Sequence, residues 1–431
     1  MYKVLFSIFL WLATTSISGQ TTLHGTVRTP EGKPLAGASI FISNTSIGTV
    51  TNDRGEFALG GIPSGRYILV ISSVGYQTDL ETIDSRFPRT SFDITLRVKA
   101  TELGAVNIRA FDKNGYKKWG ELFRENFIGT SDFSGACRIL NPEVIRIHYA
   151  PKSRTLTAFT DGPMLVENRA LGYDVQVTLD EFHYDMRTGA VFYSFFPLFK
   201  PMVGSASKES RWAKNRASAF YGSPLHFFRA LYQDRLADEG FELKMVGLKD
   251  SVMLGRLKNN LLSAYERARD SADASAGPLS PESLLGRAFL DQYDQRLDEL
   301  WENSPTYEYP GEVRPSEVVV SRDSNTMVLS WPQILRVTYL RTRPPDRYFS
   351  DFVVDPSNPE SGRRVAVSRK ATDGMTTQMQ LMRGFPMEIF SNGSNVNTDL
   401  LYHGYWTWWQ KIGNLLPYDY VPPVGSGPSA P

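Results

Sequence analysis

Short stretches of alternating apolar and polar residues, separated by turns, dominate the first part of the chain. Residues 67–74 form a long apolar stretch and predict a buried central strand. Glycine and proline mark turns at residues 30–34, 52–55 and 63–65. Short strands at such regular spacing are typical of a β-sandwich, which we expect over residues 21–98.

The rest of the chain mixes helical and strand patterns. Residues 116–126 have helical spacing, and strand patterns follow between residues 144 and 196. Helical spacing dominates a block at about residues 207–303, and strand patterns return over residues 316–410. The expected order is a linker over 99–115, an α+β domain of mixed antiparallel strands and this helical block over 116–420, and a disordered tail over 421–431.

Capping residues locate the start of one helix. Residues 208–220 form a candidate helix that Gly222 ends. Ser223 is then suited to the N-cap of the next helix, because its hydroxyl can accept a hydrogen bond from a free backbone N–H, and Pro224 suits the first helical position. A third helix is expected after Ser280.

Residues 1–20 have the pattern of a secretory signal peptide. Lys3 supplies the positive charge, residues 4–13 the apolar segment, and small residues before Gly19 a cleavage site. That segment is too short to span a bilayer, and no later stretch is long and apolar enough. With Cys137 as the only cysteine, no internal disulfide can form, which fits a bacterial protein of the periplasm or outer-membrane periphery.

Composition excludes two classes of protein. The 431 residues are 41% hydrophobic, which provides substantial cores and excludes a wholly disordered chain. The net charge is +1, so no chain-wide field would attract nucleic acid or an anionic membrane. We therefore expect no nucleic-acid partner. We expect Cys137 to be a small buried apolar residue.

Glycine, proline and aromatic residues recur in a fixed order along the predicted sandwich. The series is Gly25-x-Val27, Pro30-x-Gly32-x-Pro34-Leu35-x-Gly37-Ala38, Gly48-x-x-Thr51-Asn52, Gly55-x-Phe57, Ile62-Pro63-x-Gly65-x-Tyr67 and Val74-Gly75-Tyr76. It resembles the carboxypeptidase regulatory-like domain. The resemblance implies a transthyretin-like (prealbumin-like) sandwich that is an accessory to other domains. In that family it follows the catalytic domain of some zinc carboxypeptidases, precedes the plug of many TonB-dependent receptors of Bacteroidetes, and is not itself a peptidase.

A second resemblance covers most of the remaining chain. Its motifs are Cys137-x-Ile139-x-Asn141-Pro142, Asn168-x-x-Leu171-Gly172-Tyr173, Asn215-Arg216-x-x-Ala219-x-Tyr221-Gly222-Ser223 with His226-Phe227, Gly404-Tyr405-Trp406 and Leu416-Pro417-x-Asp419-Tyr420. The region resembles the uncharacterised C-terminal part of Bacteroidetes proteins named for their carboxypeptidase-like regulatory domain. That resemblance implies no particular activity.

The sequence lacks the motifs of the common catalytic sites. None of the five histidines lies in a zinc-binding motif, and His183, with Glu181 and Asp185 nearby, has no second imidazole beside it. The strained Gly-x-Ser-x-Gly elbow and the glycine-rich nucleotide-binding loops are also absent. We therefore expect no catalytic residue, no metal and no cofactor.

Two segments are candidate binding surfaces. Residues 207–236 combine basic and aromatic side chains, and the candidate ligand contacts there are Arg216, Tyr221, His226 and Arg229. This surface would suit an anionic ligand, a glycan or a partner protein, whereas the alternative is a helical hairpin with an aromatic core face and a solvated basic face. In residues 402–409, Trp406 and Trp408 are candidates for stacking on sugars, although alternating aromatic residues also suit a buried core.

The pattern as a whole favours an exported cell-envelope module that binds or scaffolds an envelope partner without catalysis. One alternative is a glycan-binding accessory protein, for which the two aromatic tracts argue. The other alternative is a hydrolase with an unrecognised site.

Overall fold

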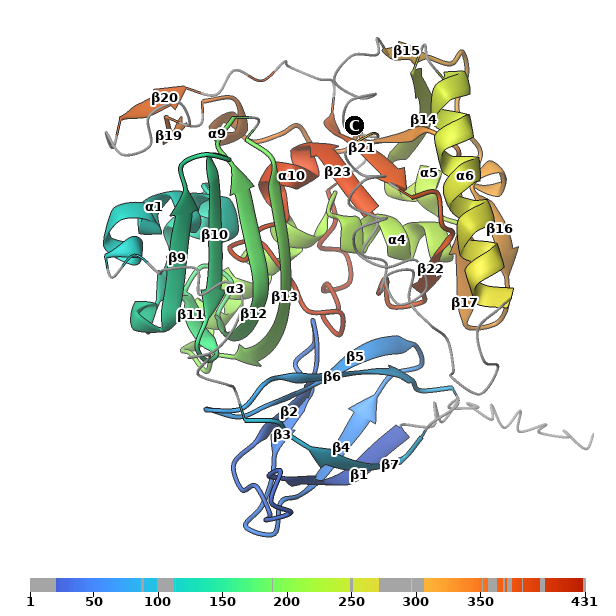
Figure 1. Cartoon of the computed structure of the whole chain (residues 1–431). Coiled ribbons are helices and arrows are strands. Elements are labelled where there is room, and N and C mark those ends of the chain that lie inside the picture. The colour runs from blue at the N-terminus through green and yellow to red at the C-terminus, as the bar shows by residue number, and fades with distance from the viewer. Residues whose placement is uncertain are drawn as a thin grey trace, which may run out of the picture.

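A sandwich of two sheets lies below a larger, two-lobed α+β region (Figure 1). The computed structural model describes residues 21–86, 89–98, 112, 114–187, 189–248, 251–270, 296, 306–350, 352–355, 363–366, 369, 374–381, 383–395 and 400–428. The expected signal peptide, most of the expected linker and most of the helix expected after Ser280 lie outside these residues.

Seven strands form the sandwich in the described part of residues 21–98. They are β1 (Thr21–Arg28), β2 (Ser39–Ile42), β3 (Gly48–Val50), β4 (Glu56–Ile62), β5 (Arg66–Ser72), β6 (Asp79–Asp84) and β7 (Ser91–Thr95). One sheet has the order β4-β1-β7 and the other β3-β2-β5-β6, so the apolar strand β5 is central as expected. In β4, buried Phe57 and Leu59 alternate with exposed residues, because successive side chains of a strand point to opposite faces. The sandwich predicted from the turns is confirmed.

A six-stranded antiparallel sheet begins the second region. Its strands are β8 (Cys137–Ile139), β9 (Ile145–Ala150), β10 (Thr155–Thr160), β11 (Met164–Asn168), β12 (Tyr173–Asp185) and β13 (Val191–Pro201). Helix α1 (Gly115–Phe127) covers one face, where Phe123 lies 5.0 Å from Phe182 between ring centroids. The short helix α2 (Asp132–Gly135) precedes β8, and the 3-10 turn Pro142–Val144 lies between β8 and β9.

Helices cross the middle of the molecule next. These are α3 (Ala206–Phe220), α4 (Pro224–Tyr232) and α5 (Leu236–Glu239). Ser223 caps α4 as predicted, since its side chain accepts a hydrogen bond from the backbone N–H of His226. Helix α6 (Ser251–Asp270) follows at the outer edge.

The expected helical block is interrupted by a strand. Strand β14 (Phe241–Leu248) pairs with β18 (Ile334–Tyr339), so the helical block predicted at about residues 207–303 contains a strand that the sequence pattern did not predict. Gly240 ends α5 in the left-handed conformation with φ 86°, which suits a residue without a Cβ. Phe241 and Leu243 are buried while Glu242 lies between them, the two-residue period of a strand.

Strands return in the last part of the chain, as expected. The second large sheet has the order β15 (Thr306–Glu308), β14, β18, β21 (Met375–Leu381) and β23 (Leu400–Gly404). A smaller sheet contains β16 (Val319–Arg322), β17 (Thr326–Leu329) and β22 (Met387–Phe390), and β19 (Phe352–Val354) pairs with β20 (Arg364–Ala366). The remaining elements are the 3-10 turn Pro315–Glu317 and the helices α9 (Asp346–Phe349) and α10 (Tyr405–Trp409).

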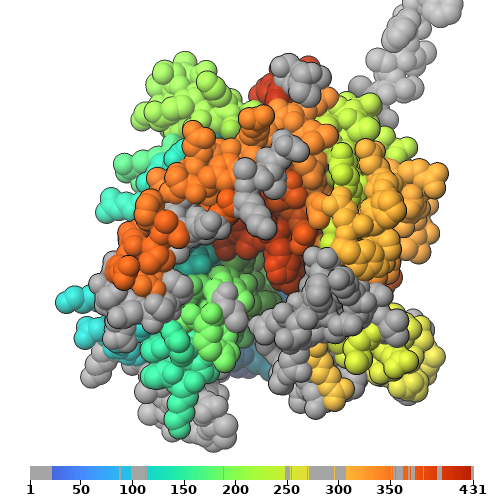
Figure 2. Space-filling view, turned by 90° about the horizontal axis from the view of Figure 1, so that it is seen from above, coloured from blue at the N-terminus to red at the C-terminus, as the bar shows by residue number. Residues whose placement is uncertain are grey.

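The aromatic tract at residues 402–409 is only partly a strand. After Gly404, whose φ of 97° turns the chain sharply, the residues form α10. Tyr405, Trp406, Trp408 and Trp409 are all buried in the core that the two lobes share. Figure 2 views the molecule from the side away from the sandwich. The orange and red C-terminal residues lie in the middle, with the cyan and green residues on one side and the yellow residues on the other.

The sandwich is fixed to the second region by its backbone and by apolar contacts. Asn44 N donates to Pro197 O at 2.8 Å, and Phe199 N donates to Thr45 O at 3.0 Å, so the loop after β2 joins the edge of β13. Phe41, Val70 and Leu198 form an apolar contact beside it. Backbone hydrogen bonds of this kind hold the two parts in one arrangement.

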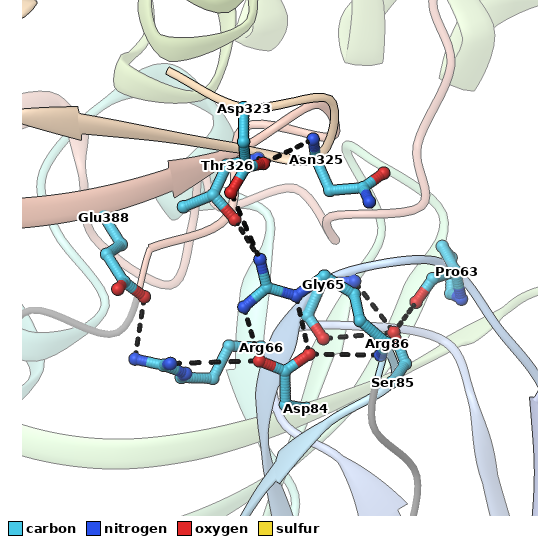
Figure 3. A network of polar contacts seen from close by, with 10 residues as sticks. All are labelled: Pro63, Gly65, Arg66, Asp84, Ser85, Arg86, Asp323, Asn325, Thr326 and Glu388. Atoms are coloured by element: carbon cyan, nitrogen blue, oxygen red, sulfur yellow. Dashed lines mark hydrogen bonds and ion pairs between the residues drawn. The ribbon is translucent and has the colours of Figure 1, made fainter. Parts of the chain in front are cut away.

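An ion-pair network strengthens the same junction (Figure 3). Arg66 pairs with Glu388 of β22 at 2.7 Å and lies 3.8 Å from Asp84. Arg86 hydrogen-bonds Asp84 and Thr326, and both arginines hold the pKa of the Asp84 carboxyl below its usual value. The network links the small sheet that contains β17 and β22 to the sandwich, and its charged side chains are partly exposed. It therefore orients the two parts more than it stabilises them.

None of the described helices is long and apolar enough to cross a membrane.

Candidate functional site

Arg216, one of the predicted ligand contacts, binds the protein's own backbone. Its Nε donates to Leu171 O at 2.6 Å and its Nη2 to Gly172 O at 2.9 Å. The guanidinium also lies 4.2 Å from the ring centroid of Tyr173. Arg216 therefore fastens α3 to the turn before β12, and its donors are turned toward the protein.

Arg229 has a similar structural role. Its guanidinium donates to three backbone oxygens, Asn392 O at 2.8 Å, Tyr420 O at 2.8 Å and Tyr418 O at 3.0 Å. Burial lowers the pKa of Arg229 to about 10, which still leaves it charged at neutral pH. The side chain joins α4 to the segment that follows α10.

His226 is a buried polar residue with both ring nitrogens occupied. Its Nδ1 accepts from Gly222 N at 3.1 Å, and its Nε2 lies 3.3 Å from Glu239 Oε2. Burial lowers the pKa of His226 to about 4, so the ring is neutral at pH 7 and donates from Nε2. Within the described residues, no group of three His, Cys, Asp or Glu side chains could hold a metal ion.

Trp406 is buried rather than displayed for stacking. It is 1% exposed, and its indole N–H donates to Gly222 O at 2.7 Å. The aromatic tract therefore belongs mainly to the core, the alternative that the sequence left open. The basic segment follows its alternative interpretation only in part. Lys208 and Arg211 are exposed to solvent as that interpretation expects, whereas Arg216 and Arg229 donate to backbone oxygens and hold helices in place.

Tyr221 and Trp408, in contrast, line one cavity. This cavity has a volume of about 760 Å³ and is called the aromatic cavity below. Its aromatic side chains are Phe133, Tyr221, Tyr405, Trp408 and Trp409. The indole N–H groups of Trp408 and Trp409 donate to Thr130 Oγ1 and Ala219 O, which leaves the ring carbons for the cavity. The volume lies within the range of natural small-molecule sites.

Polar groups stand around these rings. Lys214 of α3 and Arg343 after β18 are exposed cations on the lining, with Asp132 and Asn215 nearby. Tyr405 also lines the cavity, and its buried hydroxyl has no hydrogen-bond partner among the described residues.

The chain's C-terminal segment closes one side of the aromatic cavity. Residues Pro423, Ser426 and Pro428 belong to its lining. The Ser426 hydroxyl lies 3.2 Å from the Tyr221 hydroxyl, and Arg341 Nη1 donates to Pro428 O at 3.2 Å. Over residues 421–428 this differs from the disordered tail expected over 421–431, because the Ser426 hydroxyl and the Pro428 backbone oxygen contact side chains that follow α3 and β18.

The sequence pattern missed most of the lining. Phe133, Arg343 and the C-terminal segment come from stretches far apart in the chain, and none has a motif of its own. The sequence did offer one indication of these residues, the aromatic tract at residues 402–409. Tyr405 and Trp409 of this tract could have been predicted as candidates together with Trp408.

Two side chains that sequence analysis considered for chemistry, Cys137 and His183, lie away from the aromatic cavity. Cys137 is buried, as expected, and burial raises the pKa of its thiol to about 12, so it stays protonated. His183 has Glu181 as its hydrogen-bond partner on β12. Neither residue lines the aromatic cavity.

Comparison with known proteins identifies the sandwich. Residues 23–108 match the model of the CarboxypepD_reg-like domain. The chain is 28% identical over 126 residues to TonB-dependent receptor P39 of Formosa agariphila, which covers 29% of this chain and 11% of the receptor. It is 33% identical over 79 residues to TonB-dependent receptor SusC of Bacteroides thetaiotaomicron. This alignment covers 18% of this chain and 8% of the receptor.

Solved structures are similar over a short part of the chain. A 3-chlorocatechol 1,2-dioxygenase of Rhodococcus opacus is 15% identical with a TM-score of 0.16, over 18% of this chain and 59% of the dioxygenase. The matches to the receptors likewise span a small fraction of those proteins, so activities of the relatives do not transfer to this chain. The N-terminal sandwich of this chain is a CarboxypepD_reg-like domain, followed by an α+β region.

Proposed function

We propose that this chain is an exported, non-catalytic binding protein of the bacterial cell envelope and that it binds an oligosaccharide in the aromatic cavity. The observation that carries the proposal is the lining of that cavity: five aromatic side chains with Lys214 and Arg343 beside them. Sugars offer apolar C–H faces to aromatic rings and hydroxyls to polar side chains, so such a lining suits them.

The charges favour an acidic sugar. Lys214 and Arg343 can reach a carboxylate from the rim, where Asp132 is the acidic side chain on the lining. Arginine forms paired hydrogen bonds with carboxylates, which adds orientation to attraction. Oligosaccharides that contain uronic acid should therefore bind more tightly than neutral ones of the same length.

The envelope location has two sources of support. The first twenty residues have the pattern of a signal peptide. The CarboxypepD_reg-like domain is related to segments of two TonB-dependent receptors. In this chain the domain would serve as the accessory that holds the binding region in place, as its fixed junction with β13 suggests.

The test is a titration of the full mature chain with a panel of neutral and uronic-acid oligosaccharides. Binding is measured by calorimetry and by tryptophan fluorescence. We expect binding of acidic oligosaccharides and a change in tryptophan emission. Lys214→Met should weaken the binding of acidic oligosaccharides about tenfold, roughly 1.4 kcal/mol. Arg211→Met, a change on the same helix that removes an exposed arginine absent from the lining, should leave it unchanged.

Two results would count against the proposal. A panel without any binding would remove oligosaccharides as the ligand class. Shortened sugars after prolonged incubation with the protein would contradict a non-catalytic role and favour the hydrolase alternative.

A further inference from the structure

A second cavity lies at the junction between the sandwich and the second region. It has a volume of about 470 Å³ and is called the junction cavity below. The sandwich contributes Asn44 and Tyr67 to its lining, β13 contributes Tyr193, and the segment after α10 contributes Lys411 and Asn414. The cavity is separate from the aromatic cavity, whose lining shares none of these residues.

Lys411 places an ammonium group in this cavity without a counter-charge. The side chain is 8% exposed, and no ion pair or hydrogen bond of its Nζ is found within the described part of the chain. The nearest feature is the Tyr193 ring, with Nζ 5.0 Å from its centroid. Burial lowers the pKa of Lys411 to about 8, so it is mostly charged at pH 7. An unpaired buried charge is costly, and a bound anion would offset that cost.

Asn414 of the same lining has a buried side-chain amide. It is 1% exposed, and its Oδ1 accepts from the Ser131 hydroxyl at 2.5 Å. This hydrogen bond fixes the orientation of the amide, and Nδ2 has no acceptor among the described residues. A buried N–H without an acceptor costs about 1–3 kcal/mol, so the polar groups beside Lys411 are not fully satisfied by the protein itself.

The rest of the lining is mainly apolar and aromatic. Phe196, Leu225 and Phe228 line the junction cavity together with Tyr402 and others. Arg66 also lines it, but Arg66 is paired with Glu388 and Asp84. Lys411 is therefore the cation on this lining that has no carboxylate partner in the described parts of the chain. The combination suits a ligand with one anionic end and an apolar body.

We infer that the junction cavity binds a small carboxylate with an apolar body, whose carboxylate pairs with Lys411 Nζ. The volume falls within the range of small-molecule sites. Because residues of the sandwich form one wall, the ligand contacts both parts of the chain. Its binding therefore stabilises the junction as well as the site.

The experiment uses the full chain and three probes of equal length: decanoate, decanol and decylamine. Calorimetry should show that decanoate binds at least about tenfold more tightly than decanol, since one charge-assisted interaction contributes about 1.5–3 kcal/mol. Decylamine should bind least. Lys411→Met should bring decanoate to the affinity of decanol while decanol binds as before.

Controls separate the site from general apolar binding. Lys208→Met removes an exposed lysine and should preserve the preference for decanoate. Asn414→Asp keeps the size of the side chain but adds a negative charge, and should weaken decanoate binding more than decanol binding. Circular dichroism identifies any variant that does not fold, and Lys411→Gln then replaces Lys411→Met.

Equal affinity of the wild type for decanoate and decanol would overturn the inference, as would a preference that survives both Lys411 variants. A wild type that binds none of the three probes would overturn it as well. These results do not bear on the oligosaccharide titration, because the variants used here lie outside the aromatic cavity.

Discussion

Replacing Lys411 by methionine should make the protein more stable at neutral pH. The change removes a buried ammonium group and keeps an unbranched side chain of similar length in the space beside Gly129 and Tyr193. Burial lowers the pKa of Lys411 from 10.5 to about 8. A difference of about 2.5 units corresponds to about 3 kcal/mol of unfavourable free energy in the folded state.

The pH dependence follows from the sign of this shift. At pH 7 Lys411 is mostly charged in both the folded and the unfolded protein. The folded protein therefore carries the full unfavourable free energy of burying the charge. As pH rises through about 8 the folded protein releases the proton first, and the cost vanishes above pH 10.5. The stability gained by Lys411→Met should fall from about 3 kcal/mol at pH 7 to about 2 kcal/mol at pH 9 and below about 1 kcal/mol at pH 10.

Neighbouring groups should not obscure this profile. Tyr193 and Tyr418 line the same cavity, and burial raises the pKa of each to about 12, while the pKa of Tyr402 is raised further. They therefore stay neutral between pH 7 and pH 10.5.

The assay is urea unfolding of the wild type and the variant at each pH without added ligand. Lys208→Met, which removes an exposed lysine of α3, is the matched control and should change stability by less than about 0.5 kcal/mol at every pH. A variant less stable than the wild type at pH 7 would refute the reasoning, and so would a stability difference that does not change between pH 7 and pH 10.

Four further predictions concern single features of the structure. Arg229→Met should destabilise the protein by about 3 kcal/mol in urea, because three backbone oxygens lose a charged donor, whereas exposed Arg211→Met should change little. Gly129→Ala should cost about 2 kcal/mol, since φ is +102° and a Cβ would lie 2.8 Å from Ser134 Oγ; unchanged stability would be inconsistent with this close approach. Cys137 should react with a thiol reagent at pH 8 only after unfolding, because the pKa of its buried thiol is raised to about 12. A double-mutant cycle of Arg66→Met and Glu388→Gln should give a coupling of about 0.5–1 kcal/mol, and a value near zero would show that the pair adds nothing to the junction.

Local chemistry made part of the fold predictable. The cap of α4 depends on Ser223 and Pro224 alone, and the sandwich depends on turns whose glycines and prolines adjoin the strands they connect. In both cases the determining contacts lie within a few residues of one another. The sequence is therefore sufficient for these elements.

Long-range packing determined what the sequence could not predict. Strand β14 lies between helices, and its identity as a strand depends on pairing with β18, nearly a hundred residues later. The tract at 405–409 is buried around most of its circumference, so no periodicity distinguishes a strand from a helix.

The candidate site was harder to predict for the same reason. Arg216 and Arg229 looked like surface charges, because the backbone oxygens they bind come from other segments of the chain. Tyr221 and Trp408 line the aromatic cavity together although nearly two hundred residues separate them. Lys411 gave no signal at all, since a lysine is ordinarily exposed and its burial depends on the junction with the sandwich.

A crystal structure of the full chain with the tightest-binding oligosaccharide of the panel would test the binding role most directly. We predict an intact sugar in the aromatic cavity, with its rings against Tyr221 and Trp408 and its acidic group near Lys214 or Arg343. A sugar bound at any other surface, or a cleaved one in the cavity, would contradict the account.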